Sequence, residues 1–178
     1  MKFYFLPKIQ MNVIQIQKKD ELDILQCKET SFEKLEFEFS EKYIKSLKDT
    51  LDLKNSVQLM VKNGDNFCGY LCGYEHEFWP NLLFLSELFI DPNYQGKGIG
   101  SKLVTEFLEK AKKLNLKKAM TQTEFKNIPA QKLYEKMGFV KIENKEWNEG
   151  ITYELIFKDG KKQNSSPSGH LTADICRG

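Results

Sequence analysis

Residues 85–103 read LSELFIDPNYQGKGIGSKL, and this stretch decides the fold of the 178-residue chain. Its first half continues an apolar strand predicted over 82–90, which Asp91-Pro92 ends. Its second half, QGKGIG, leads directly into an amphipathic helix predicted over 98–115. Glycines at alternate positions allow successive backbone N–H groups to face one side, beside the positive end of the helix dipole. The stretch therefore predicts a turn that binds a phosphate or pyrophosphate group.

Two other phosphate-binding motifs do not match this turn. A Walker A loop ends in GK followed by Ser or Thr, and that ending is absent. A dinucleotide-binding Rossmann loop needs GxGxxG and an acidic residue about 20 positions later, whereas this turn reads GxGxG. Lys97 and Lys102 add positive charge nearby. A plain glycine-rich turn before a helix is the alternative interpretation.

Hydrophobic periodicity on both sides of this stretch predicts an α+β fold, with one mixed, mostly antiparallel sheet flanked by helices. Two helices are expected between residues 20 and 53. A short helix over 129–137 has Pro129 in its first turn and Gly138 at its end. The strands are expected at 11–17, 56–62, 66–78, 82–90, 117–125, 139–143 and 151–158.

Two motifs together resemble the GNAT superfamily of acyl-CoA N-acyltransferases. The first is the Q-x-x-G-x-G pattern at 95–100. The second is Asn127-Ile128-Pro129-Ala130 followed by LYEKMGF at 133–139, a short helix that ends in a glycine and an aromatic residue. The motifs occur in family order with a strand between them, and the resemblance spans residues 11–158. It implies the GNAT fold and N-acetyltransferase activity with acetyl-CoA as cosubstrate.

The resemblance also implies where acetyl-CoA binds. The strand through 87–90 would separate from the strand at 117–125, and the pantetheine arm would lie in the gap and pair with its backbone. Amides of the glycine turn would hold the pyrophosphate, and Asn127 would orient the cosubstrate. The expected contacts are Leu88, Phe89, Ile90, Gln95, Gly96, Lys97, Gly98, Ile99, Gly100, Ser101, Asn127 and Tyr134.

Two residues are the candidates for proton transfer. Tyr134 would face the sulfur and act as the acid for the leaving thiolate; the alternative is a core tyrosine. Glu87 interrupts an apolar strand, where a carboxylate is costly, and is the candidate base; the alternative is a structural glutamate. Glu75, His76 and Glu77 are weaker candidates for the base.

The acceptor is expected to be a primary amine of a small molecule or peptide that attacks the thioester directly. Residues 29–41 hold five glutamates, one lysine and three phenylalanines, which would suit a cationic amine such as a polyamine, an aminoglycoside or a peptide amine. The alternative is a solvated helix face. The turn near Trp79 is a second candidate for selectivity. A non-catalytic acyl-CoA-binding sensor and a nucleotide-binding regulatory domain are the rival functions.

Composition argues against several other classes. A formal charge of +2 gives no footprint for nucleic acid, and no apolar run reaches the ~18 residues that span a bilayer. The apolar patch near Pro7 is too short for a signal peptide, so we expect a cytoplasmic protein with no membrane partner. Four cysteines without CxxC spacing predict no metal site, and Cys68 and Cys72 are expected on one face of a strand.

The domain boundary is expected near residue 160. Residues 1–160 would form one GNAT domain, as a monomer or homodimer. Residues 161–178 are polar and contain the single arginine of the chain, Arg177. We expect this segment to be a tail outside the fold, either disordered or derived from an expression vector.

Overall fold

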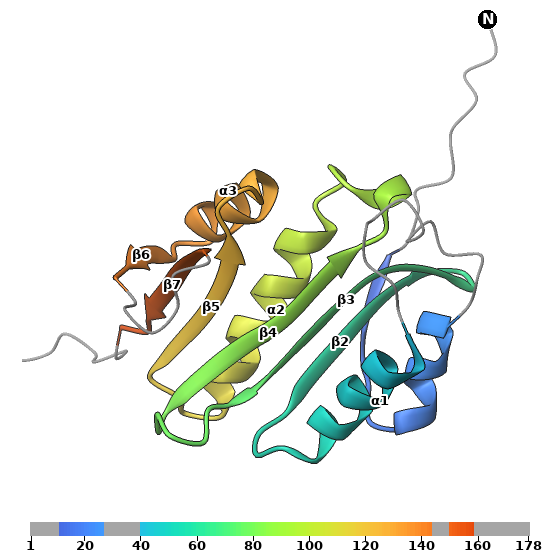
Figure 1. Cartoon of the computed structure of the whole chain (residues 1–178), viewed down its shortest axis with the longest axis horizontal. Coiled ribbons are helices and arrows are strands. Elements are labelled where there is room, and N and C mark those ends of the chain that lie inside the picture. Colours follow the sequence, from blue (N-terminus) through green and yellow to red (C-terminus); the bar gives the residue numbers. More distant parts are fainter. Residues whose placement is uncertain (1–10, 27–39, 144–149, 159–178) are drawn as a thin grey trace, which may run out of the picture.

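A computed structural model describes residues 11–26, 40–143 and 150–158. Its sheet has seven strands in the order β1-β2-β3-β4-β5-β7-β6, and only the β4–β5 pair within it is parallel (Figure 1). The predicted α+β architecture with a mostly antiparallel mixed sheet is therefore confirmed. The elements are β1 (Asn12–Gln15), η1 (Lys19–Gln26), α1 (Glu41–Asp49), η3 (Thr50–Asp52), β2 (Val57–Asn63), β3 (Asn66–Glu75), β4 (Leu82–Ile90), η4 (Pro92–Tyr94), α2 (Ile99–Lys113), β5 (Lys118–Glu124), α3 (Ile128–Lys136), β6 (Val140–Ile142) and β7 (Gly150–Ile156).

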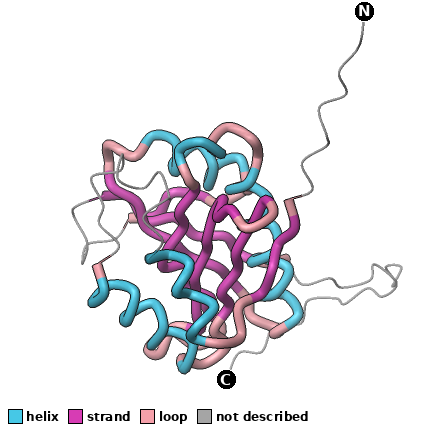
Figure 2. Tube along the Cα trace, turned by 90° about the vertical axis from the view of Figure 1, so that its right-hand side faces the viewer, coloured by secondary structure: helices cyan, strands magenta, loops and turns pink. Residues whose placement is uncertain are grey.

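Helices cover both faces of the sheet (Figure 2). On one face, α2 packs its apolar stripe, including Leu103 and Phe107, onto β2, β3, β4 and β5. Tyr134 of α3 belongs to the same core. On the other face, Ile44 and Leu47 of α1 pack with η1 against residues of β2 and β3. We call these the α2 face and the α1 face.

Several element boundaries differ from the sequence prediction. The first of the two predicted helices is a 3-10 helix, Lys19–Gln26. The strand predicted over 66–78 ends at Glu75, because the chain turns there towards β4. The segments 27–39 and 159–178 lie outside the described residues. They hold most of the glutamate-rich segment 29–41, which is expected to suit a cationic amine, and all of the proposed tail.

The predicted shared face of Cys68 and Cys72 is wrong. The β2–β3 register shifts between Val61 and Lys62, so Cys68 is an extra residue on β3. Cys68 therefore packs in the α2 core, while Cys72 packs in the α1 core.

None of the helices that the structure describes combines the length and the apolar content needed to cross a bilayer.

Candidate active site

β4 and β5 pair over four residues each and then separate. Their parallel pairing ends with Leu85 opposite Thr121. β4 continues to Ile90, still paired with β3, and β5 continues to Glu124, still paired with β7. Beyond Leu85 and Thr121 the facing edges of the two strands have no ladder partner in the described part of the chain (Figure 1). We call this point the fork, and the gap expected between these strands begins there.

A β-bulge just past the fork sets the direction of Glu87. Gly73 of β3 pairs with Leu85, but Cys72 pairs with Glu87, so Ser86 is an extra residue on β4. Leu85 packs in the α2 core. After the extra residue, Glu87 lies on the α1 face, where its charge acts on Cys72. The bulge therefore keeps the carboxylate out of the larger apolar core.

Gly73 is needed for the close strand approach at this bulge. A Cβ on Gly73 would lie 2.4 Å from the backbone oxygen of Phe84 and 2.5 Å from the ring of Phe107. The backbone oxygen cannot move without shifting β4 itself. A glycine is therefore required where the register changes.

Burial raises the pKa of Glu87 above its ordinary value of 4.5, while the neighbouring hydroxyl groups of Tyr43 and Ser86 lower it. The charge of Glu87 acts on four other titratable groups, and burial raises the pKa of each one. None is charged near pH 7, and no cationic group contributes to the pKa of Glu87 among the described residues. The four groups are Tyr70, Cys72, Tyr74 and Tyr134.

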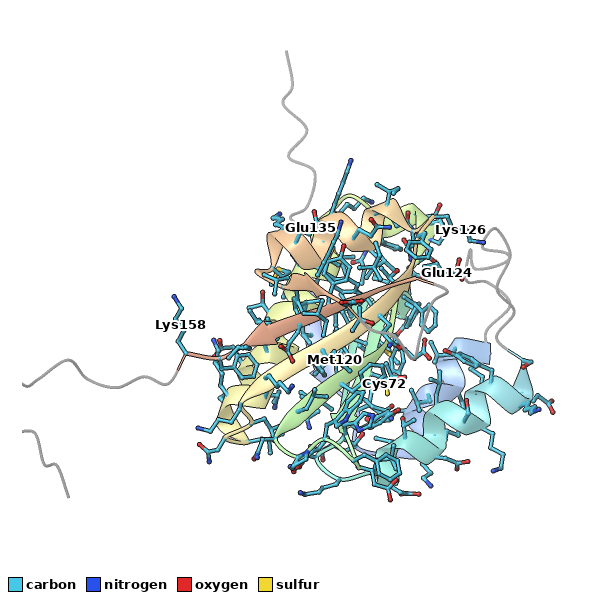
Figure 3. The ribbon with its side chains drawn as sticks, turned by 60° about the vertical axis from the view of Figure 1, so that its left-hand side comes forward. Cys72, Met120, Glu124, Lys126, Glu135 and Lys158 are labelled. Atoms are coloured by element: carbon cyan, nitrogen blue, oxygen red, sulfur yellow. The ribbon has the colours of Figure 1, made fainter. Side chains whose placement is uncertain are left out.

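Tyr134 approaches the fork from the α2 face. Its side chain is only 4% exposed, and its ring packs against Phe139 and Tyr153 at centroid distances of 5.8 and 5.7 Å. Burial raises the pKa of Tyr134, the Thr121 hydroxyl lowers it, and the charge of Glu87 raises it again. The two candidate residues thus sit close to the fork on opposite faces of the sheet. In Figure 3, Met120 and Glu124 mark β5 on one side of the fork, and Cys72 marks β3 beyond β4.

The glycine-rich turn lies at the far end of β4 and is open. Gly96 and Gly98 have φ angles of 72° and 80°, which favour glycine, and a Cβ at either position would meet nothing within 4 Å. Among the described residues, none accepts a hydrogen bond from the backbone amides of residues 95–101. Gln95 Nε2 donates to the carbonyl oxygen of Ile90 at 3.2 Å, which ties the turn to β4. These amides, at the N-terminus of the 15-residue helix α2, fit a phosphate group.

The charged and polar neighbours of this turn differ in their availability. Lys97 Nζ lies 4.9 Å from the centre of the Tyr94 ring and stays near the turn. Lys102 Nζ donates instead to the carbonyl oxygen of Met11. Asn127 caps α3, because its Oδ1 accepts from the backbone N–H of Ala130 at 3.2 Å. Its side-chain amide is exposed on the α3 side of the gap.

The weaker candidates lie elsewhere. Glu75 is held by Lys54 Nζ at 2.9 Å and Asn55 Nδ2 at 2.7 Å, and these contacts lower its pKa despite burial. The ring of His76 stacks on Trp79 at 4.4 Å. Glu75 ends β3, and His76 and Glu77 lie in the turn that leads to the start of β4. This turn is at the end of β4 opposite the glycine-rich turn, so the structure does not bring these residues to the fork. Among the described residues, no three His, Cys, Asp or Glu side chains gather in a group that could hold a metal ion.

Sequence reasoning missed two residues at the site. The ring of Tyr43, on α1, meets Phe89 edge-on at 6.2 Å, and its hydroxyl acts on Glu87. Thr121 lies in a strand predicted to border the gap, and nothing in the local sequence distinguishes it from the polar residues that follow it.

Comparison with solved structures defines the class of fold. PaiA N-acetyltransferase from Thermoplasma acidophilum, in complex with coenzyme A, is 17% identical, with a TM-score of 0.61 over 83% of this chain and 99% of that one. The ribosomal-protein-S18-alanine N-acetyltransferase of Escherichia coli is also 17% identical, with a TM-score of 0.66 over 87% and 99%. At this identity the likeness establishes the GNAT acetyltransferase fold.

A match to a family model identifies the protein family of the chain. Residues 22–139 match the model described as the acetyltransferase (GNAT) family, and the chain belongs to that family. It is also similar to N-alpha-acetyltransferase 30 of Saccharomyces cerevisiae, with 33% identity over 76 residues, or 41% of this chain and 43% of that protein. The chain spans about half the length of the curated relatives it matches.

Proposed function

We propose that the chain transfers an acetyl group from acetyl-CoA to a primary amine by direct attack at the fork. The observation that carries this proposal is the position of Glu87 and Tyr134. One is a carboxyl group with a raised pKa and the other a buried phenol, and they lie on opposite faces of the sheet. The fork between them is continuous with β4, which leads to the open amide turn. Family membership supports the acetyltransferase class.

In this proposal, acetyl-CoA binds on the α2 side of the gap. The amides of residues 95–101, with Lys97 nearby, would hold the pyrophosphate. The edge of β4 that faces the gap, along Leu88, Phe89 and Ile90, would hydrogen-bond the pantetheine arm as an additional strand does. Asn127 would donate its side-chain amide to the same arm, because its oxygen is already used in capping α3.

Glu87 would act as the base on the acceptor side. An amine with a pKa of about 10.4 is neutral in only about one molecule in 2,500 at pH 7, a burden of about 4.6 kcal/mol. The raised pKa of Glu87 makes its carboxylate a better proton acceptor. The proton passes from the ammonium group to Glu87, directly or through water. The neutral nitrogen then attacks the thioester carbon, and the extra proton that the nitrogen carries after bond formation passes to solvent as the carbon–sulfur bond breaks.

Tyr134 would act as the acid on the other side. As the carbon–sulfur bond breaks, the sulfur carries a negative charge, and the parent thiol has a pKa of about 8.5. The phenol of Tyr134 is protonated near pH 7, because burial raises its pKa, and it can donate to the departing sulfur. No covalent intermediate on the protein is needed, and both cysteines of β3 are buried in apolar cores.

The acceptor is proposed to be a cationic primary amine. Glu87 is a partly buried carboxylate, and no cationic group contributes to its pKa among the described residues, so an ammonium group would fill that place. Two similar proteins, an N-alpha-acetyltransferase and an L-2,4-diaminobutyric acid acetyltransferase, favour peptide α-amines and diamino acids as the acceptor class.

A thiol-release assay with acetyl-CoA tests this function. Peptides with free N-termini, diamino acids, polyamines and aminoglycosides are supplied in turn, and free coenzyme A is measured. We expect release that depends on one of these amines, together with a product heavier by one acetyl group in mass spectrometry. Calorimetric binding of acetyl-CoA without transfer to any amine would favour the acyl-CoA-binding sensor instead. Thermal stabilisation by ATP or NAD, but not by coenzyme A, would favour a nucleotide-binding regulatory domain.

A further inference from the structure

Thr121 occupies the last position of β5 that pairs with β4, at the fork itself. Its side chain is buried, with 1% exposure, and its hydroxyl donates to the carbonyl oxygen of Leu85 at 3.0 Å across the parallel pair. On its other side, Thr121 pairs in register with Tyr153 of β7. The ring of Tyr153 is one of the two against which Tyr134 packs. Thr121 therefore lies between the end of the β4–β5 ladder and the proposed acid.

The hydrogen count of a threonine hydroxyl limits what Thr121 can do. The group has one hydrogen to donate and lone pairs with which to accept. While that hydrogen is given to Leu85, the Thr121 oxygen can only accept from Tyr134. The Thr121 hydroxyl lowers the pKa of Tyr134, and both residues border Tyr153. In the resting arrangement that we infer, Tyr134 would donate to Thr121 while Thr121 donates to the carbonyl oxygen of Leu85.

We propose that Thr121 is a positioning residue for Tyr134 and switches its hydrogen bond during the transfer, an inference that rests on the proposed function. When Tyr134 gives its proton to the departing sulfur, Tyr134 becomes a phenolate. Thr121 keeps its own hydrogen and rotates from Leu85 to donate to the phenolate oxygen. No other proton or electron pair moves in this step. The Leu85 carbonyl loses one hydrogen bond until Tyr134 is reprotonated from solvent.

The electrostatics of the site favour this switch. Burial and the charge of Glu87 both oppose a phenolate at Tyr134, and the Thr121 hydroxyl is the group that favours it. Hydrogen bonds to charged groups are about twice as strong as those between neutral groups. Thr121 would therefore stabilise the state that forms as the thiolate leaves, more than it stabilises the resting state.

Kinetics of three variants test the proposal. We expect Thr121→Val, which keeps the shape and removes the hydroxyl, to lower kcat about tenfold with less than about a twofold change in KM for acetyl-CoA. Thr121→Ser restores the hydroxyl and should return kcat to within about threefold of the wild type. Thr123→Val is the matched control. Thr123 is also a buried threonine of β5, 7% exposed, two residues beyond the last β4–β5 pair, and we expect its replacement to leave kcat unchanged.

A double-mutant cycle separates positioning from a general structural effect. In a Tyr134→Phe background, Thr121→Val should have no further effect on kcat, because the phenol through which Thr121 acts is gone. An equal loss of kcat in both backgrounds would overturn the proposal. So would failure of Thr121→Ser to restore the rate.

An NMR measurement that does not depend on enzymatic activity distinguishes this proposal from the function on which it rests. In protein labelled with ¹³C at the tyrosine Cζ atoms, the Tyr134 resonance is identified by its loss in Tyr134→Phe. We expect Thr121→Val to move this resonance and Thr123→Val to leave it in place. An unmoved resonance overturns the hydrogen-bonded pair whether or not an acceptor is known. A moved resonance in a protein inactive towards every amine supports the pair and counts against the proposed function alone.

Discussion

Replacement of Glu87 by glutamine should make the protein more stable and much less active. Burial raises the pKa of Glu87, so the ionised carboxyl is disfavoured in the folded state. The fold is therefore most favoured where Glu87 is protonated, and the stability of the wild type falls as pH rises from about 4.5 through the folded-state pKa. Glu87→Gln removes that loss. The stability advantage of Glu87→Gln over the wild type should therefore be present near pH 7 and absent below the ordinary glutamate pKa.

The size of this gain follows from two opposing effects. Desolvation of a partly buried carboxylate costs several kcal/mol. The neighbouring hydroxyl groups of Tyr43 and Ser86, which lower the pKa of Glu87, offset part of that cost. The raised pKa shows that desolvation is the larger effect. A net gain of about 1 kcal/mol would raise Tm by about 2–4 °C in a chain of this size. Loss of the base should lower kcat by ~10²-fold or more.

Glu75→Gln is the matched control on the neighbouring strand. Contacts with Lys54 and Asn55 lower the pKa of Glu75, so its stabilising effect is present above the ordinary pKa and lost as pH falls. This variant should lose about 1 kcal/mol and keep its activity. Thermal unfolding followed by circular dichroism, with the thiol-release assay, measures both quantities. A Glu87→Gln protein that is less stable than wild type near pH 7, or fully active, would refute the reasoning.

Three further predictions, one of them with a matched control variant, have defined outcomes. Tyr134→Phe should lower kcat by ~10²-fold or less and leave acetyl-CoA affinity unchanged by calorimetry; unchanged turnover removes Tyr134 from the mechanism. Gly98→Ala and Gly64→Ala both place a methyl group in open space at a positive φ, so each should cost about 1–2 kcal/mol of stability. Only Gly98→Ala should weaken acetyl-CoA binding, and equal dissociation constants would contradict the assignment of the turn. Gly73→Ala should lower the free energy of unfolding by about 3 kcal/mol in a urea titration, because its Cβ would clash with backbone; a wild-type midpoint would show that the strands can separate there.

Local patterns were sufficient to predict most of the fold. The glycine-rich turn, the amphipathic repeat of α2 and the Pro129–Gly138 boundaries of α3 each depend on residues close in sequence. The structure bears these out through the positive φ of Gly98 and Gly138 and through the side-chain cap by Asn127. The resemblance to the GNAT superfamily depends on the same segments, and residues 22–139 match the model of the acetyltransferase (GNAT) family.

Register was the part that the sequence could not predict. Period-2 alternation assigns a face only while pairing is regular, and a single extra residue reverses it. One such shift separates the faces of Cys68 and Cys72, and another lies beside Ser86. Each bulge depends on the neighbouring strand. The contacts of Tyr43 and Thr121 at the site likewise depend on tertiary packing, which no local pattern contains.

The bulge beside Glu87 shows that the aim of a side chain can be encoded on a different strand. Gly73 pairs with Leu85 and not with Glu87, yet its missing methyl group lets β3 and β4 approach where the register changes. Anyone transplanting the glutamate onto another sheet would therefore have to carry this glycine as well. A search for the same geometry in other proteins should look for the pair, on adjacent strands, and not for the acid alone.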